Sequence, residues 1–118
     1  MPEQEHSLGR VEVSPAAIAS IASEAVSSCY GVVGTADKDL ATGIATAISS
    51  TRKRGIEVRI EEGRIIINVY VIVEYGVRIV AVARSVMNVV KFSVERALGI
   101  PVAEVNVHVE GLRVSDVD

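Results

Sequence analysis

The sequence predicts an α+β domain of two layers: a βαββαβ-type fold with helices packed on one face of a mainly antiparallel sheet and one extra short helix inserted. Two patterns lead to this class. Residues 56–74 alternate apolar and polar side chains with the period of a β-hairpin. Residues 77–98 carry an apolar stripe at helical spacing and contain no Gly or Pro. With 118 residues, of which 49% are apolar, the chain can build one packed domain and is not expected to be disordered.

A short strand and a helix open the domain. Residues 9–13 alternate polar and apolar side chains, which predicts the first strand. Ser14 before Pro15 predicts a helix start, because the hydroxyl can cap free backbone amides and proline lacks only an N–H that has no partner there. The helix is expected to end near Gly31. Its apolar stripe contains Ile18, Ile21, Ala22, Ala25 and Cys29. As the only cysteine, Cys29 is expected to be a small buried residue without a disulfide.

The next segment is predicted to contain a loop and the inserted short helix. Residues 31–34, with glycine at both ends, form the loop. Asp37 or Asp39 can cap a helix whose apolar face is Leu40, Ile44 and Ile48. The polar run at residues 49–54 is expected to end that helix before Gly55.

Residues 56–74 form the predicted hairpin, with its turn at residues 61–64 and Gly63 supplying the positive φ of a tight turn. One parity is expected to line the core: Val58, Ile60, Ile65, Ile67, Val69, Val71 and Val73. On the opposite parity, Ile66, Tyr70 and Ile72 form an apolar strip if helices cover only one face. Such a strip is a candidate surface for a protein partner or for self-association. The alternative is that the short helix covers it.

The long helix and a last strand complete the domain. Gly99 and Pro101 follow residues 77–98 as an ordinary helix-ending signal. Residues 105–109 alternate valine with polar side chains and predict the final strand. A ferredoxin-like arrangement is the expected topology for this order. Flexible tails at residues 1–8 and 115–118 are expected to flank a single domain at residues 9–114.

Charge and hydropathy exclude several classes of function. The net charge of −3 gives no basic surplus for neutralising phosphates, so DNA is not expected as a partner and RNA is not the first choice. The longest apolar run, residues 65–73, is shorter than the roughly 20 residues of a membrane-spanning helix. The first residues lack the basic start and apolar stretch of a secretory signal, which predicts a cytoplasmic location.

Two segments resemble the alkaline shock protein family, the general stress proteins of Gram-positive bacteria. One reads VEYG at residues 73–76, and the other reads EVNVHVEG at residues 104–111. Further matches are Gly9, Val11, Val13, Ile18, Ile21, Gly31, Val32, Val33, Gly34, Val77, Ala83, Val90, Lys91, Val94, Leu98 and Gly99. The resemblance therefore spans nearly the whole chain.

The resemblance implies a non-enzymatic protein of the single-domain branch, abundant in the cytoplasm and acting in the cell-envelope stress response. The resemblance also implies that membrane-anchored partners hold the protein at the inner face of the membrane. Protein partners are therefore expected, among them a membrane-anchored protein of the same family, and a homo-oligomer is expected as well. The resemblance implies no cofactor and no catalytic motif.

Candidate chemical sites are few. His108 and Glu110 share the outward parity of the last strand and could share a proton, but no nucleophile or third group accompanies them. A solvated strand pair is therefore the preferred interpretation. No catalytic residue and no metal site is assigned, since the ligand spacing that metal sites need is missing.

A small KH-like RNA-binding module is the alternative function. Residues 31–34 have the GxxG spelling of the loop with which KH domains hold an RNA backbone. Val32 and Val33 stand where such loops usually carry polar or basic residues, so a plain turn is the preferred interpretation.

Arg52, Lys53 and Arg54 form the densest basic run and a candidate contact to an anionic bilayer. Three cations contribute about 3 kcal/mol there, which requires a second signal for stable attachment. A solvated helix end, whose cations suit the helix dipole, is the preferred interpretation of this run.

Overall fold

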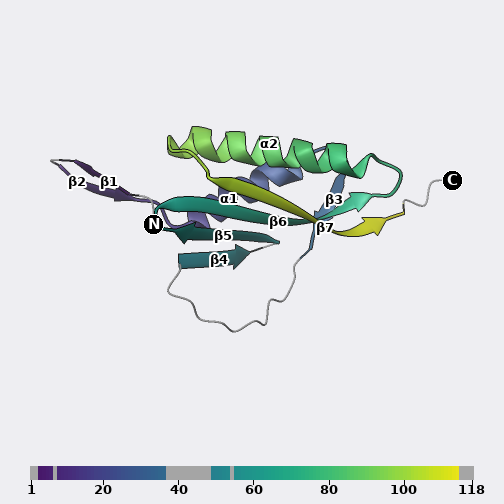
Figure 1. The fold of residues 1–118 in the computed structure, drawn as a ribbon, viewed down its shortest axis with the longest axis horizontal. Coiled ribbons are helices and arrows are strands. Elements are labelled where there is room, and N and C mark those ends of the chain that lie inside the picture. Colours follow the sequence, from purple (N-terminus) through teal and green to yellow (C-terminus); the bar gives the residue numbers. More distant parts are fainter. Residues whose placement is uncertain (1–2, 7, 37–48, 54, 115–118) are drawn as a thin grey trace.

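The computed structural model describes residues 3–6, 8–36, 49–53 and 55–114 (Figure 1). Its main sheet contains β3 (Val32–Thr35), β4 (Ser49–Lys53), β5 (Ile56–Glu61), β6 (Arg64–Glu74) and β7 (Glu104–Arg113). The helices are α1 (Pro15–Ser27) and α2 (Ile79–Leu98). A separate two-stranded sheet consists of β1 (Glu3–His6) and β2 (Gly9–Glu12). The predicted α+β class is confirmed.

Strand β6 is the centre of the main sheet. One of its edges pairs antiparallel with β5 along the first half of the strand and with β3 along the second half. Its other edge pairs with β7, which runs parallel to it because α2 crosses over between the two strands. The strand β4 pairs with β5 and lies at the edge of the sheet.

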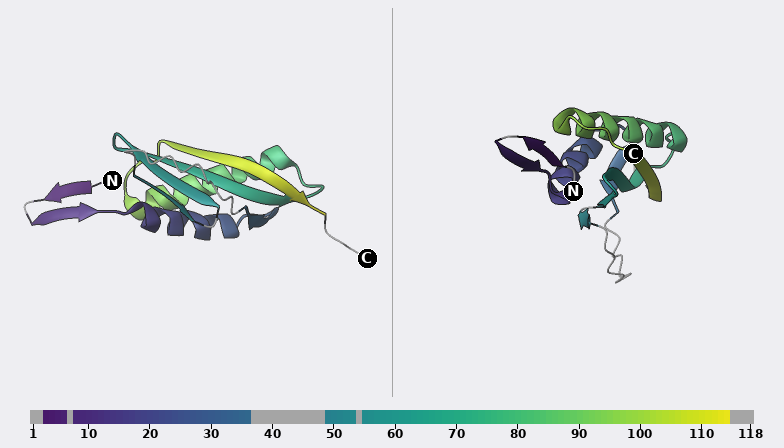
Figure 2. Two further views of the ribbon diagram at one scale, coloured as in Figure 1. Left: turned by 90° about the horizontal axis from the view of Figure 1, so that it is seen from below. Right: turned by 60° about the vertical axis from the view of Figure 1, so that its left-hand side comes forward.

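Both helices lie on one face of the sheet, as predicted (Figure 2). The predicted parity of the hairpin is buried and faces them, and Val58, Ile67, Val69, Val71 and Val73 are fully inaccessible. Helix α2 contributes a stripe of buried valines at four-residue spacing: Val82, Val86, Val90 and Val94. In the described part of the chain the buried set contains no polar or charged side chain, so the core rests on aliphatic packing alone.

The start of α1 and the end of α2 have local causes that the sequence predicted. The Ser14 hydroxyl accepts a hydrogen bond from the Ala17 amide at 3.2 Å, and Pro15 is the first residue of α1. At the end of α2, Gly99 takes a left-handed conformation with φ +77° and donates its amide to the Glu95 carbonyl at 2.8 Å.

Four predictions for the first half of the chain were wrong. The first strand pairs with β1 in its own hairpin and not with the main sheet, because residues 3–6 offer a partner that is close in sequence. Part of the expected flexible tail is thus a strand. Residues 31–34 form most of β3 and not a loop, and the polar run contains β4 and not a helix end. The inserted helix with Leu40, Ile44 and Ile48 lies outside the described residues, as does the tail at 115–118.

Gly55 precedes β5 and lies where β3 and β5 meet, at the middle of β6. Its φ is +74°, and a Cβ added there would lie 2.8 Å from the Ala36 carbonyl oxygen and 3.0 Å from that of Tyr70. The Gly55 carbonyl accepts the Tyr70 amide at 2.9 Å, and the Tyr70 carbonyl accepts the Ala36 amide at 2.8 Å. A side chain would therefore disturb the backbone at the point where β6 changes partner from β5 to β3.

We expect Gly55→Ala to lower the free energy of unfolding by more than about 2 kcal/mol, since it adds a backbone clash to the strain of a positive φ. Gly63→Ala is the matched control, because Gly63 has φ +77° with nothing within 4 Å of an added Cβ. It should cost only the strain, on the order of 1 kcal/mol. Urea denaturation measures both, and equal losses would contradict the crowding at Gly55.

A polar clamp ties the end of α2 to the start of β7. One Glu95 carboxylate oxygen accepts hydrogen bonds from Lys91 Nζ and from the Val102 amide, both at 2.9 Å. Lys91 Nζ also donates to the Val102 carbonyl at 2.8 Å. The hydrogen bond from Lys91, followed by that from the Val102 amide, lowers the pKa of Glu95 from its ordinary value of 4.5.

A lowered folded-state pKa stabilises the fold above pH 4.5, and this contribution is lost as the pH falls through the folded-state value. We expect Glu95→Gln to be less stable than the wild type at pH 7 and to approach it in acid. Thermal melts between pH 7 and pH 3 measure the difference. A gap between the two proteins that stays constant over this range would exclude the ionised clamp.

Candidate interaction surface on the outer face of the sheet

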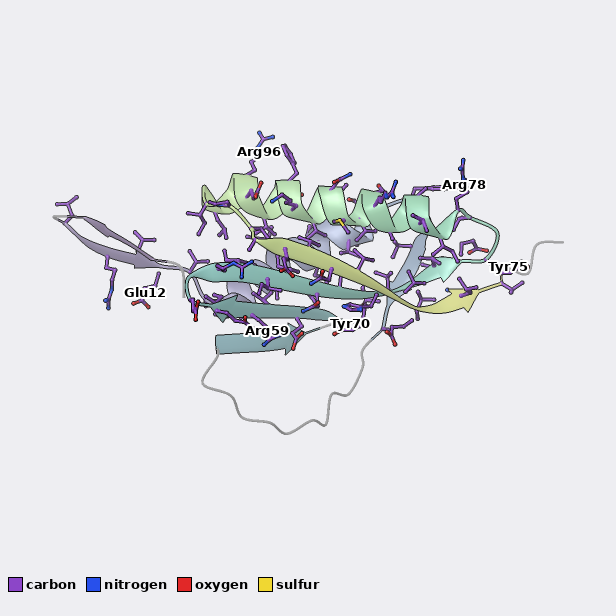
Figure 3. All side chains as sticks on the ribbon, in the orientation of Figure 1. Glu12, Arg59, Tyr70, Tyr75, Arg78 and Arg96 are labelled. Carbon is purple, nitrogen blue, oxygen red and sulfur yellow. The ribbon has the colours of Figure 1, made fainter. Side chains whose placement is uncertain are left out.

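The face of the main sheet opposite the helices carries the candidate site. We call it the outer face and define it by residues of three strands: Glu57, Arg59, Ile66, Asn68, Tyr70, Ile72, Asn106 and His108. They alternate along the strands with the side chains that fill the core. Figure 3 shows Arg59 and Tyr70 on the neighbouring strands β5 and β6.

The strand register places the outer-face residues in rows that run from β5 across β6 to β7. Asn68 lies between Glu57 on β5 and Asn106 on β7, and Tyr70 lies opposite His108. Asn68 on β6 and its partner Asn106 on β7 are 38 residues apart in the chain. The parallel pairing of β7 with β6 is what brings the two asparagines, and the tyrosine with the histidine, side by side.

Asn68 is the centre of a hydrogen-bonded row. Its Nδ2 donates to Glu57 Oε1 at 3.1 Å, and its Oδ1 accepts from Asn106 Nδ2 at 3.2 Å. Asn106 Nδ2 also lies 3.3 Å from Glu104 Oε1. Since these partly buried groups satisfy one another across three strands, the row fixes the strands laterally and holds its side chains in one arrangement.

Tyr70 and His108 form a stacked aromatic pair next to this row. Their ring centroids are 4.5 Å apart and the ring planes differ by 14°. His108 Nε2 lies 3.2 Å from Asn68 Oδ1, which can only accept, so the nitrogen bonds to it when it carries a hydrogen. Both His108 contacts orient its ring.

The predicted strip is only partly accessible. Ile66 is buried, with 8% of its surface exposed, and the expectation that it is exposed was wrong. Its neighbours across the sheet, Arg59 and Glu104, carry long side chains on either side of it. Tyr70 and Ile72 are half-buried. Tyr70 and Ile72 therefore remain as accessible members of the predicted surface.

Asn68 and Asn106 were not predicted as site residues, and His108 was considered only together with Glu110. Their outward parity was visible in the sequence, but their meeting depends on the parallel register of β6 and β7, which one sequence does not reveal. A register step at Val71 and Ile72 removes Glu110 from the paired positions. A solvated strand pair was the preferred interpretation of His108 and Glu110, and the structure shows His108 in contact with Tyr70 and Asn68.

The remaining predicted positions lie elsewhere. Arg52 and Lys53 belong to β4, opposite Glu57 and Ile56, while Arg54 lies outside the described residues, and so do the side chains of the whole basic run. Cys29 is buried as predicted, and burial raises the pKa of its thiol. The GxxG segment enters a strand of the sheet, so the helix–loop–helix setting of a KH loop does not occur there.

The described residues contain neither a candidate metal cluster nor a candidate membrane-spanning helix. They contain no group of three or more His, Cys, Asp or Glu side chains able to hold a metal ion. Neither α1 nor α2 combines the length and the hydrophobicity of a helix that crosses a membrane.

Comparison with known proteins assigns the chain to a family. Residues 3–114 match the model of the alkaline shock protein 23 family, which is described by a cell envelope-related function. The chain belongs to this family. The match confirms the resemblance to alkaline shock proteins, and it gives the chain a cell envelope-related function.

Several bacterial proteins are similar to this member of the alkaline shock protein family along most of their length. YloU of Bacillus subtilis is 37% identical over 110 residues, which cover 92% of each chain. YqhY of the same organism is 30% identical over 96% of this chain and 84% of its own length. Spy1614 of Streptococcus pyogenes is 30% identical over 90% of this chain and 89% of its own. No solved structure matches the chain.

A double-mutant cycle tests the aromatic pair. Tyr70→Ala and His108→Ala together should cost less than the sum of the single losses, with a coupling energy of about 0.5 to 1.5 kcal/mol from the stack. The matched cycle combines His108→Ala with Phe92→Ala, because Phe92 is exposed on α2. This second cycle should be additive within about 0.5 kcal/mol. Additivity of the first cycle in urea denaturation would show that the pair does not stabilise the outer face.

Proposed function

We propose that this chain is a non-enzymatic interaction module that binds another protein through its outer face, in the cytoplasm at the inner side of the cell envelope. The family supplies the envelope-related function. The observation that carries the proposal is the Tyr70–His108 pair, which is held in one orientation beside half-buried Ile72 on the face away from both helices.

The chemistry of this surface suits a protein partner. Tyrosine presents apolar area together with a hydroxyl and loses little conformational entropy on binding, which explains its enrichment at binding hot spots. The stack on His108 and the Asn68 row restrict the ring before any partner arrives. Gly111 lies opposite Ile72 and has no side chain to cover it from β7. An apolar centre with a polar border is the usual composition of a specific interface.

The non-enzymatic part of the proposal rests on the sequence, which offers no nucleophile with a positioned base. His108 is the candidate acid or base on this face, and its ring is stacked on Tyr70 with Nε2 at the Asn68 amide oxygen. We assign His108 the role of supporting the tyrosine.

Photo-crosslinking in cells tests the proposal. A photoreactive amino acid at position 70 should give a defined protein adduct at the envelope, whereas the same amino acid at position 92, on exposed Phe92 of α2, should not. Once the crosslinked partner is identified, Tyr70→Glu should reduce the amount of that partner that co-purifies with this chain at least about tenfold, since the change places a charge in the apolar centre. Phe92→Glu is the control for the added charge.

Circular dichroism separates binding from folding in this experiment. Capture that stays unchanged in a folded Tyr70→Glu protein would exclude the outer face as the docking surface. An adduct that disappears after ribonuclease treatment would point to RNA in place of a protein.

A further inference from the structure

Ile72 lies between two glycines on the outer face of the sheet. In the strand register, Gly34 of β3 is its partner on one side and Gly111 of β7 is its partner on the other. The row before it places Tyr70 beside His108, whose rings stack. In the Ile72 row, by contrast, the central side chain has no side chain level with it on either neighbouring strand. We call Gly34, Ile72 and Gly111 the glycine row.

Two register steps bring the glycines into this row. On β7 the step passes over Glu110, so that Gly111 is level with Ile72. On β3 the step passes over Val33, so that Gly34 is level with the same isoleucine. Steps of this kind re-aim side chains and are frequent next to functional sites. Without them, a glutamate and a valine would flank Ile72.

The backbone does not require glycine at either position. Neither Gly34 nor Gly111 has a positive φ. A Cβ added to Gly34 would meet no atom within 4 Å, and a Cβ added to Gly111 would lie 3.9 Å from Ile72 Cγ1, which is an ordinary contact. Glycine inside a strand destabilises it, and it often marks a place that a ligand or another chain approaches closely. The two glycines therefore keep a hollow open on each side of Ile72.

An aromatic row and a charged row border these hollows. Tyr70 and His108 lie on one side, and Glu74 lies opposite Arg113 on the other. Ile72 itself is half-buried, so part of its side chain is accessible between the hollows. Arg113 is exposed, and no ion pair among the described residues includes its guanidinium. The glycine row thus combines accessible apolar surface with a cation that can pair with an acidic group.

We propose that Gly34 and Gly111 determine which partner the outer face accepts, because they admit two large aliphatic side chains of that partner, one on each side of Ile72. An acidic side chain of the partner then pairs with Arg113. The inference rests on the proposed function, since it concerns the partner that Tyr70 contacts. Large apolar side chains that fill fixed hollows are typical of binding hot spots, and a charge pair at the border adds specificity.

The photoreactive amino acid at position 70 tests this inference before the partner is identified. Gly34→Val and Gly111→Val should each lower the yield of the position-70 adduct at least about tenfold, since they fill the hollows. Circular dichroism should be unchanged, and the midpoint of urea denaturation should stay equal or rise, because valine suits a strand better than glycine. A lower yield from an equally stable protein separates this role from a purely structural one.

Controls test bulk and charge separately. Ala103→Val adds bulk at an exposed position before the start of β7 and should leave the adduct yield unchanged. Arg113→Glu should lower the yield at least about threefold because it opposes the acidic side chain of the partner. Arg96→Glu, at an exposed position on α2, should not.

The outcomes distinguish this inference from the proposed function. Folded valine variants that give the wild-type yield would overturn the role of the glycine row and leave the proposed function standing. A chain that gives no position-70 adduct with both glycines intact would overturn both. If a valine variant does not fold, Gly34→Ala and Gly111→Ala give the same test with a single methyl group, and an unchanged yield from both would overturn the inference.

Discussion

The structure depends on β6 having one face that is fully buried and two edges that are fully paired. Its valines at positions 69, 71 and 73 have no accessible surface, and its backbone bonds to β5 and β3 on one edge and to β7 on the other. A shift of one residue would turn these valines away from the helices, so the aliphatic face fixes the register of the whole sheet. Gly55 makes the arrangement possible by letting one edge serve two strands.

The same register determines what the outer face presents. Since core and outer residues alternate on β6, fixing Val69 and Val71 toward the helices also fixes Asn68 and Tyr70 on the other side. The Asn68 row and the Tyr70–His108 stack then add lateral contacts to β5 and β7. For the proposed partner, a surface held in this way lowers the entropic cost of binding.

Local patterns in the sequence predicted the parts of the fold that local interactions determine. Periodicity or capping within a few residues explains several correct predictions. These are the β5–β6 hairpin with its glycine turn, the N-cap at Ser14, the C-terminal end of α2 at Gly99 and the valine stripe of α2. Strands β3 and β4 were missed because they are short and owe their conformation to partners on β6 and β5. The polar run was mistaken for a helix end because its pattern does not reveal that β5 lies beside it.

The candidate site was predicted only in part for the same reason. The outward parity of Tyr70 and Ile72 was correct, but burial of Ile66 depends on flanking residues from β5 and β7. The contact between Tyr70 and His108 requires the parallel pairing, which no local pattern encodes.

The crossover from β6 through α2 to β7 also sets the order in which this surface can appear during synthesis. The β5–β6 hairpin can close once β6 has left the ribosome, whereas β7 follows only after the twenty residues of α2. Until β7 inserts, Tyr70 has no His108 to stack on and Asn68 has no Asn106. A partner that recognises the assembled rows therefore binds finished molecules and ignores nascent chains.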